Sequence, residues 1–364
     1  MSEVKISVIM PVYNARTLVS HSIDSLLAQT FKEIEVIAVD DRSTDDTFEY
    51  CKELYKDEPR VRVIQAEQNG GPGKARTLGI AQAKGEYITF LDSDDGIVPD
   101  AFEKMYAVAK EYDADVVHTT GMLIPVAKPM PEDLMSLPAD RLCPTTQDKN
   151  APSEITVIPE DTGKRIDGWL MHMYQGNVWG KLFRRSFLAE KEIVFPEMKM
   201  MEDIIFSLKA LLTAKTYVQM PGDFVIYRIT NESTSRGKRN TAFVAKLIKV
   251  MLQNNIEIPR CFNSVEYFKD HRDYIKKTMQ VITMVGESMY VGPAYQKLGR
   301  QTVENDPLVK EVWKEFFGEQ AEYVSDMWCR NMDRLPPMPD ELDVYDSYEY
   351  WEKKLEEYHA ERKG

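Results

Sequence analysis

The acidic run Asp92-Ser93-Asp94-Asp95 follows a short apolar segment that ends at Leu91. Carboxylates two residues apart at a strand end, such as Asp92 and Asp94, can both face a hard divalent cation. Mg²⁺ and Mn²⁺ prefer such oxygen ligands and complete their coordination shells with water and substrate phosphates. Aspartate is also a common turn residue, so the run by itself fits either a metal site or an acidic turn.

A second acidic pair, Glu202-Asp203, is flanked by Met200-Met201 and by Ile204-Ile205-Phe206. These apolar neighbours indicate that at least one of the two carboxylates is partly buried. Burial raises the pKa of a carboxyl group, and a pKa nearer neutrality suits a general base. Acidic residues also favour helix N-termini, so a catalytic base and a simple helix start both remain open.

A glycine-rich segment, Gly70 to Arg76, matches neither familiar phosphate-binding loop. A P-loop needs Ser or Thr after its Gly-Lys pair, where Ala75 stands, and a dinucleotide fingerprint needs glycine where Arg76 stands. The remaining interpretations are a loop that enters a helix, with Lys74 and Arg76 near its positive end where an anion could bind, or a turn that carries surface cations.

The elements that would position these residues alternate between strand and helix over the first 120 residues. Strands are predicted at residues 6–10, 35–39, 61–64 and 87–91, and helices at residues 17–29, from about 45 through Leu54, and 74–83. This order predicts an α/β fold with a mostly parallel sheet and helices on both faces. Tyr13-Asn14, Asp40-Asp41 and the acidic run each follow a strand end, so they should meet at one sheet edge, where ligands bind in such folds.

The rest of the chain divides into a proline-punctuated stretch and a helical region. Residues 121–168 are predicted to be a long loop or an inserted subdomain. A helix at 201–213 and a strand at 224–227 follow, and the sequence beyond Asn240 is almost entirely of helical type. We therefore predict one domain at residues 1–238 and a helical domain at residues 239–364.

Composition limits the classes of function. The 364 residues carry a formal net charge of −13, which argues against nucleic-acid binding because that needs a basic surface. A bound metal ion could still attract a small anion locally. No apolar run approaches the roughly 18 residues that span a bilayer, and the N-terminus lacks the layout of a signal peptide. We expect a cytoplasmic protein; contact with the inner face of the membrane, and a homodimer formed through the C-terminal region, remain open.

The segment Ile6-Ser7-Val8-Ile9-Met10-Pro11-Val12-Tyr13-Asn14 closely resembles the opening of family 2 glycosyltransferases, which have the GT-A fold. The likeness continues in the same order through Ser25–Thr30, Glu35–Thr47, Gly70–Ile80, Gly85–Asp95, Asn177–Arg185 and Glu202-Asp203, and it fades after Tyr227-Arg228. It covers about the first 235 residues apart from the proline-rich stretch. Each motif alone is weak, but their number, order and spacing make the resemblance strong.

The resemblance implies an inverting enzyme that moves a sugar from a nucleotide-sugar donor, expected to be a UDP-sugar, to a hydroxyl group. The expected acceptor is a glycan or lipid-linked glycan in the synthesis of bacterial surface polysaccharide or glycoconjugate. Mn²⁺ or Mg²⁺ is the implied cofactor, with Asp94 as its direct ligand and Asp92 on the ribose or on a metal-bound water. Asp203 matches the catalytic base, and Glu202 lies beside it.

Further residues are carried over by position. The residues implied to bind the nucleotide-sugar are Pro11, Val12, Tyr13, Asn14, Asp41, Arg76, Asp92, Ser93 and Asp94. Among them, the ring of Tyr13 would stack on the base, Asp41 would hydrogen-bond the base, and Arg76 would contact the nucleotide or diphosphate. The residues implied on the sugar and acceptor side are Trp179, Lys181, Arg228 and Arg236, with the segment from Arg228 to Arg236 closing over the diphosphate.

Two other functions are compatible with an α/β sheet of this kind. A sugar-nucleotide pyrophosphorylase would need a glycine-rich, arginine-containing loop after the first strand, and residues 11–16 do not form one. A catalytically inactive GT-A protein that binds a nucleotide or a glycan is the main alternative, because a fold does not fix a function. The presence of both Asp94 and Asp203 favours an active enzyme.

Overall fold

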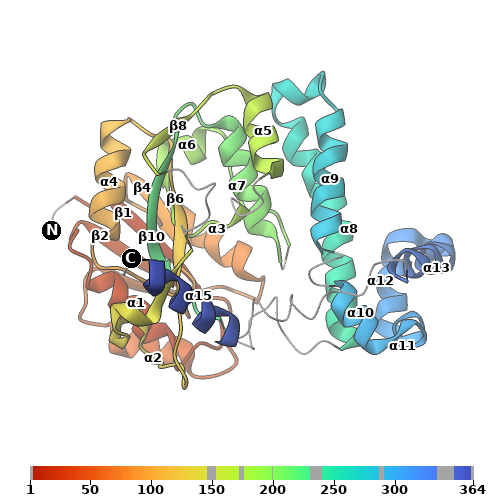
Figure 1. Ribbon diagram of the computed structural model, residues 1–364, viewed down its shortest axis with the longest axis horizontal. Helices are drawn as coiled ribbons and strands as arrows, with labels where there is room; N and C mark the ends of the chain where they lie inside the picture. Colours follow the sequence, from red (N-terminus) through yellow and green to blue (C-terminus); the bar gives the residue numbers. More distant parts are fainter. Residues whose placement is uncertain are drawn as a thin grey trace. The chain divides into compact units, whose positions relative to one another are not determined.

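The computed structural model describes residues 3–145, 153–171, 176–198, 200–229, 240–286, 291–333 and 348–361. The chain divides into two compact units, one formed by Met1–Ile229 with Trp351–Gly364 and the other by Thr230–Tyr350 (Figure 1). The first unit thus includes the last helix of the chain. The domain boundary at residue 238 that the sequence suggests stays a prediction.

The first unit is built on one twisted sheet. Its strands are β1 (Ile6–Val12), β2 (Ile34–Asp40), β3 (Val61–Gln65), β4 (Tyr87–Phe90), β5 (Gly96–Ile97), β6 (Val116–Pro125), β7 (Leu142–Pro144), β8 (Thr156–Ile158), β9 (Lys181–Arg184) and β10 (Tyr217–Ile226). Their order is β3-β2-β1-β4-β9-β6-β10-β5, with β7 beside β6 and β8 beside β10. Strands β1 to β4 are parallel to their neighbours among themselves, as predicted. Strand β9 runs antiparallel between β4 and β6, which the sequence pattern did not predict.

Helices lie around this sheet. Those of the first unit are α1 (Val19–Leu27), α2 (Thr47–Leu54), α3 (Pro72–Gln82), α4 (Ala101–Glu111), α5 (Thr162–Met171), α6 (Arg185–Glu190), α7 (Glu202–Thr213) and α15 (Tyr348–Glu361). Val8 of β1 belongs to one buried cluster with Ile23 of α1 and Phe102 of α4. On β4, Phe90 packs edge-on against Phe206 of α7, with ring centroids 5.6 Å apart. The predicted α/β sheet with helices packed against it is confirmed.

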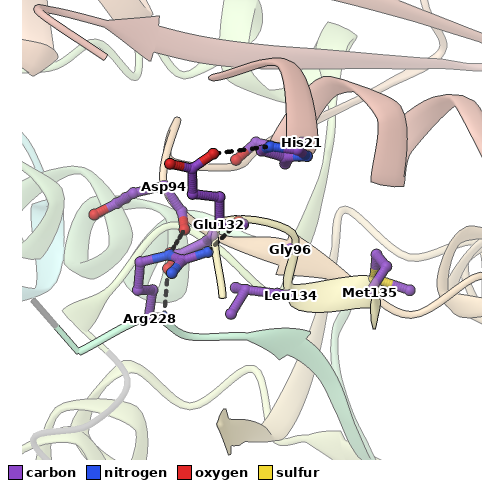
Figure 2. Close-up of a pocket in the computed structure, with 9 residues that line it drawn as sticks. His21, Asp94, Gly96, Glu132, Leu134, Met135 and Arg228 are labelled. Atoms are coloured by element: carbon purple, nitrogen blue, oxygen red, sulfur yellow. Dashed lines mark hydrogen bonds and ion pairs between the residues drawn. The ribbon is translucent and has the colours of Figure 1, made fainter. Parts of the chain in front are cut away.

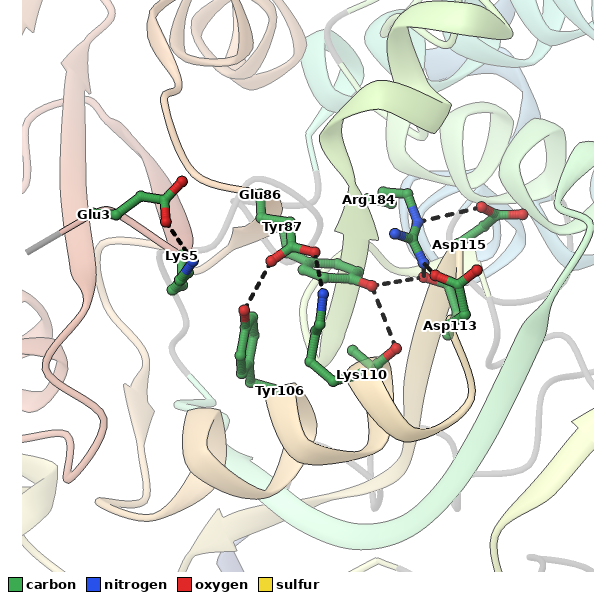
Figure 3. Close-up of polar contacts among 11 residues, drawn as sticks. Glu3, Lys5, Glu86, Tyr87, Tyr106, Lys110, Asp113, Asp115 and Arg184 are labelled. Carbon is green, nitrogen blue, oxygen red and sulfur yellow. Dashed lines mark hydrogen bonds and ion pairs between the residues drawn. The ribbon is translucent and has the colours of Figure 1, made fainter.

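Polar contacts fix α4 and β9 against strand β4 (Figure 3). Glu86, just before β4, accepts hydrogen bonds from Tyr106 at 2.8 Å and Lys110 at 2.7 Å, both on α4. Arg184, the last residue of β9, forms ion pairs with Asp113 at 2.5 Å and Asp115 at 3.5 Å. These contacts hold the start of the strand whose other end leads into the acidic run.

The proline-rich stretch contains short regular elements. Beyond β6 it holds the 3₁₀ helices η1 (Leu134–Ser136) and η2 (Ala139–Arg141), then β7, β8 and the start of α5. Arg165 of α5 is buried and donates hydrogen bonds to the carbonyl oxygens of Leu211, at 2.9 Å, and Ala214. Since these carbonyls lie at the C-terminal end of α7, the stretch is anchored to the helix that begins with Glu202-Asp203.

The second unit is helical, as predicted. It comprises α8 (Thr241–Asn263), α9 (Asp273–Gly286), α10 (Gly292–Leu298), α11 (Arg300–Asn305), α12 (Pro307–Phe317) and α13 (Ala321–Met332), with the 3₁₀ helices η4 (Glu266–Lys269) and η6 (Gly318–Gln320). Its interior includes an aromatic cluster in which Trp328 contacts Trp313 and Tyr295. Among the helices of the described residues, none combines the length and the apolar character needed to cross a bilayer.

Candidate functional site

The carboxyl ends of β1, β2 and β4 meet at one edge of the sheet, because these strands are parallel neighbours. Pro11 and Val12 end β1, and Tyr13 follows with 48% of its surface exposed. Asn14 has a left-handed backbone (φ 48°) and binds the loop after β2, where its side-chain oxygen accepts from the backbone N–H of Thr44 at 2.8 Å. The predicted convergence of the first two strand ends is present.

Asp41 joins the end of β2 to the glycine-rich loop. Its two carboxylate oxygens accept hydrogen bonds from the backbone N–H groups of Gly70 at 2.8 Å and Gly71 at 2.7 Å. Gly71 has φ 86°, a backbone conformation that favours glycine, and precedes Pro72, the first residue of α3. Asp41 therefore anchors the glycine-rich loop to the end of β2.

Arg76, in the second turn of α3, is 5% exposed and lies between two carboxylates. It donates to Asp92 Oδ1 at 2.8 Å and to Glu202 Oε1 at 2.7 Å. The structure therefore joins three sequence-predicted site residues that come from distant parts of the chain. The direct connection from Arg76 to Glu202 has no local signal in the sequence, since it depends on the tertiary fold.

The residues of the acidic run differ in how far they are exposed to solvent. Asp92, Ser93 and Asp94 are partly exposed, whereas Asp95 is buried and accepts a hydrogen bond from the backbone N–H of Arg228 at 2.9 Å. Burial, with the charges of Asp94 and Asp92 adding to it, raises the pKa of Asp95 well above its ordinary value. Asp95 is therefore a buried part of the turn, and Asp92 and Asp94 are the carboxylates of the run that a ligand could reach.

Arg228 supports the turn of the acidic run from the end of β10 (Figure 2). Its guanidinium donates to the backbone carbonyls of Asp94 at 3.0 Å, Pro131 at 2.6 Å and Glu132. His21 of α1 lies 3.8 Å from the Glu132 carboxylate in the same small pocket. The sequence assigned Arg228 to the sugar and acceptor side, and here its side chain binds backbone carbonyls. Arg236 lies outside the described residues.

Asp203 occupies the first turn of α7, directly after Glu202. It is partly exposed, whereas Glu202 is buried. Burial among its neighbours, together with the charge of Glu202, raises the pKa of Asp203 to about 7, and Arg76 opposes that rise. A carboxyl group that titrates near neutral pH and reaches the surface has the properties required of a general base.

Lys181 and Trp179 belong to the segment that leads into β9. Lys181 is 1% exposed, and its ammonium donates to both oxygens of Asn177, at 3.0 Å for the side-chain oxygen. Burial lowers its pKa to about 7, against the opposing effect of Asp203. Trp179 is partly exposed and stacks on Tyr227, with ring centroids 5.7 Å apart. Tyr227 was not among the predicted site residues, although it ends a predicted strand.

The donor atoms of the site suit a hard cation. Asp92 and Asp94 offer carboxylate oxygens at a strand end, the ligand type that Mg²⁺ and Mn²⁺ prefer. Within the described ranges, no group of three or more His, Cys, Asp or Glu side chains is arranged to hold a metal ion. Mg²⁺ in nucleotide sites commonly uses one or two carboxylates together with substrate phosphates, so the residues present fit such an ion.

Comparisons with known proteins show which family this chain is similar to. The profile described as "Glycosyl transferase family 2" matches residues 7–180. A poly(ribitol-phosphate) beta-glucosyltransferase from Bacillus spizizenii is 33% identical over 228 residues, which cover 61% of this chain and 32% of that relative. The chain spans 38% of the length of the glycosyltransferase GlyG from Streptococcus pneumoniae, to which it is 44% identical over 117 residues, and 32% of the Bacillus spizizenii relative.

Solved structures share the fold. Staphylococcus aureus TarS in complex with UDP-GlcNAc has a TM-score of 0.59 at 23% identity, covering 98% of this chain and 92% of that one. A mannosyltransferase, PcManGT from Pyrobaculum calidifontis, in complex with GDP-Man and Mn²⁺ has a TM-score of 0.51 at 14% identity, covering 90% and 84%. At these identities the likeness shows the fold, and the predicted GT-A fold is confirmed.

Proposed function

Since the chain belongs to glycosyltransferase family 2, we propose that it transfers a sugar from a nucleotide-sugar donor to an acceptor hydroxyl. The observation that carries the proposal is the position of Asp203. This partly exposed carboxyl, with a pKa raised to about 7, follows Glu202, which Arg76 joins to Asp92 of the acidic run. A base and the carboxylates of a donor site are thereby held in one polar network.

The donor is proposed to be a UDP-sugar. Tyr13 offers a ring that is 48% exposed at the end of β1, which suits stacking on a base. Pro11, Val12 and Asn14 would form the remainder of the pocket, and Asp41, which follows β2, would hydrogen-bond the base. The UDP-GlcNAc complex of the structurally similar TarS supports this choice of nucleotide.

A divalent cation, Mn²⁺ or Mg²⁺, is proposed on Asp94, with Asp92 and Ser93 beside it on the donor. When bound, such an ion neutralises the negative charge that grows on the departing nucleoside diphosphate. The Mn²⁺ in the complex of the structurally similar mannosyltransferase supports a metal at this kind of site. Asp92 already accepts from Arg76 through one oxygen, and its other oxygen is the one available to the donor.

Asp203 is proposed to remove the proton from the acceptor hydroxyl as that oxygen attacks the anomeric carbon, with inversion of configuration. Because Asp203 has a pKa of about 7, it can accept this proton near neutral pH and return it to water afterwards. Trp179 and Tyr227 offer partly exposed rings on which a sugar could pack. Lys181, being buried, would act on this side by holding the segment that carries Trp179.

The acceptor is proposed to be a glycan or lipid-linked glycan of the bacterial surface. The similarity to a poly(ribitol-phosphate) beta-glucosyltransferase of Bacillus spizizenii supports an acceptor of that kind. A cytoplasmic location, contact with the inner membrane face and a homodimer through the C-terminal helical region complete the proposal. These three features rest on the sequence alone.

The experiment that tests the proposed function measures UDP release from a panel of nucleotide sugars with Mn²⁺. UDP-glucose, UDP-galactose and their N-acetylated forms would be offered with and without a polyol-phosphate polymer as acceptor. We expect at least one donor to release UDP, and faster release with acceptor present. Binding of a nucleotide without any release would favour the alternative, an inactive GT-A protein that binds a nucleotide or glycan.

A further inference from the structure

Arg76 is enclosed by groups from three separate segments. Besides its hydrogen bonds to Asp92 and Glu202, the ring of Phe195 lies 5.6 Å from the guanidinium carbon. The side chain is 6% exposed, and those of its two acidic partners are 34% and 5% exposed. Both terminal nitrogens of Arg76 therefore donate to protein carboxylates, and Arg76 is the cation that pairs with the buried Glu202.

The backbone around this cluster is shaped to allow these contacts. A Cβ atom on Gly73 would lie 2.7 Å from Cγ of Glu202, so the absence of a side chain there makes room for the glutamate. Met201, directly before Glu202, has φ 61°, a left-handed conformation that non-glycine residues seldom adopt. Such strained backbone persists only when surrounding contacts hold it in place, and the Arg76–Glu202 pair is one such contact.

We propose that Arg76 is a positioning residue that couples the donor side of the site to the base. By holding Asp92 with one nitrogen and Glu202 with another, it fixes the start of α7 relative to the acidic run, and with it Asp203. This inference rests on the proposed function. It gives Arg76 a different role from the contact with the nucleotide or diphosphate that the sequence resemblance implies.

The pair also sets the charge around Asp203. Burial, Glu202 and Asp92 raise the pKa of Asp203, and Arg76 lowers it. Lys181 also interacts electrostatically with Asp203. Removing the positive charge of Arg76 would leave Glu202 unopposed and shift the titration of Asp203 to higher pH. Removing the negative charge of Glu202 would shift it to lower pH.

The test compares the pH dependence of kcat/KM in the wild type, Arg76→Met, Arg76→Lys, Glu202→Gln and the double variant Arg76→Met with Glu202→Gln. In the wild type, kcat/KM should fall on the acidic side of the profile as Asp203 is protonated, and we call this fall the acidic limb. We expect the acidic limb to move to higher pH in Arg76→Met and to lower pH in Glu202→Gln. In the double variant it should return toward the wild-type position. Arg76→Lys keeps the charge but loses the planar fork. Arg76→Lys should therefore leave the acidic limb at its wild-type pH. It should still lower kcat about tenfold or more, because the groups that Arg76 positions would be displaced.

Calorimetric titration with UDP and Mn²⁺ accompanies each profile and distinguishes the outcomes. Arg76→Lys with a wild-type kcat and a UDP affinity reduced about tenfold or more would overturn the proposal and assign Arg76 to the donor. An unmoved limb in Glu202→Gln would overturn it as well, even if Arg76→Met does not fold. A wild-type chain that releases no UDP would instead refute the proposed function itself.

Discussion

Replacing Asp203 with asparagine removes a proton acceptor and changes little else at the start of α7. The side chains have nearly the same size, and an amide oxygen can still accept the hydrogen bond that Asp203 Oδ1 receives from the backbone N–H of Ile204 at 2.9 Å. The buried pair of Arg76 and Glu202 is untouched. We therefore expect Asp203→Asn to fold and to bind the donor, but to lose transfer.

The size of the loss follows from the role. General base catalysis typically contributes about 100- to 10,000-fold to a rate, which corresponds to about 2.7–5.4 kcal/mol at 1.36 kcal/mol per factor of ten. The asparagine offers no group that could take the acceptor proton near pH 7, so we expect kcat to fall within this range or beyond it. Donor affinity should change less than about threefold, since none of the residues assigned to the nucleotide is altered.

The assay measures UDP release with donor, acceptor and Mn²⁺, and calorimetry with UDP measures donor binding. Asp57→Asn is the matched control, because Asp57 is exposed and the chemical change is the same. The control should keep its wild-type rate. If Asp203→Asn turned over within about threefold of the wild type, while remaining folded, Asp203 would not be the base.

The pH profile supplies a second measurement on the same residue. A base is active when unprotonated, and the pKa of Asp203 is raised to about 7. The wild-type kcat/KM should therefore be highest above pH 7 and fall about tenfold per unit as the pH drops below it. Residual activity of Asp203→Asn should lack this limb. A limb that persists unchanged in the variant would assign it to another group.

Three further predictions address the donor side. Asp94→Ala should remove the tightening of UDP binding by Mn²⁺, and calorimetric titrations that show the same tightening in the variant would contradict the metal assignment. Tyr13→Ala should weaken UDP binding by about 1–3 kcal/mol, the usual worth of stacking on a base, whereas Tyr13→Phe should bind normally. Gly71→Ala should lower the free energy of unfolding by about 1–3 kcal/mol, because φ 86° and ψ 171° place this residue in a region that essentially only glycine adopts. An unchanged midpoint of urea unfolding would contradict this prediction.

The predictable parts of the fold are the strands whose own residues form a recognisable apolar run. Strands β1, β2 and β4 are short runs that are almost wholly buried, so the apolar pattern alone marks them. Strand β9, Lys181–Arg184, has no such pattern, because charged residues stand at both ends and leave only two apolar residues between them. Its buried lysine has partners, in Asn177, that only the folded chain brings together.

The site also has parts that the sequence predicts and parts that it does not. The placement of Tyr13, Asp41 and Asp92 at one edge follows from the parallel order of their strands, which the sequence indicates. The partner of Arg76 does not follow, because an arginine after a glycine-rich loop fits a phosphate ligand as well as it fits a carboxylate. Only the structure, in which α7 brings Glu202 to 2.7 Å from it, shows that both of its terminal nitrogens are used by the protein.

The negative charge at the edge of the sheet that carries the site should make UDP binding depend on a divalent cation. Carboxylates dominate this edge: those of Asp41, Asp92, Asp94, Glu202 and Asp203. Two backbone N–H groups bind Asp41, and Arg76 is shared between Asp92 and Glu202. A diphosphate approaching Asp94 would therefore meet negative charge, on a chain whose formal net charge is −13. A bound divalent cation reverses the local field, so we expect UDP affinity to depend on Mn²⁺ or Mg²⁺ far more than uridine affinity does. Equal metal dependence of the two ligands would mean that the cation acts on the protein and not on the diphosphate.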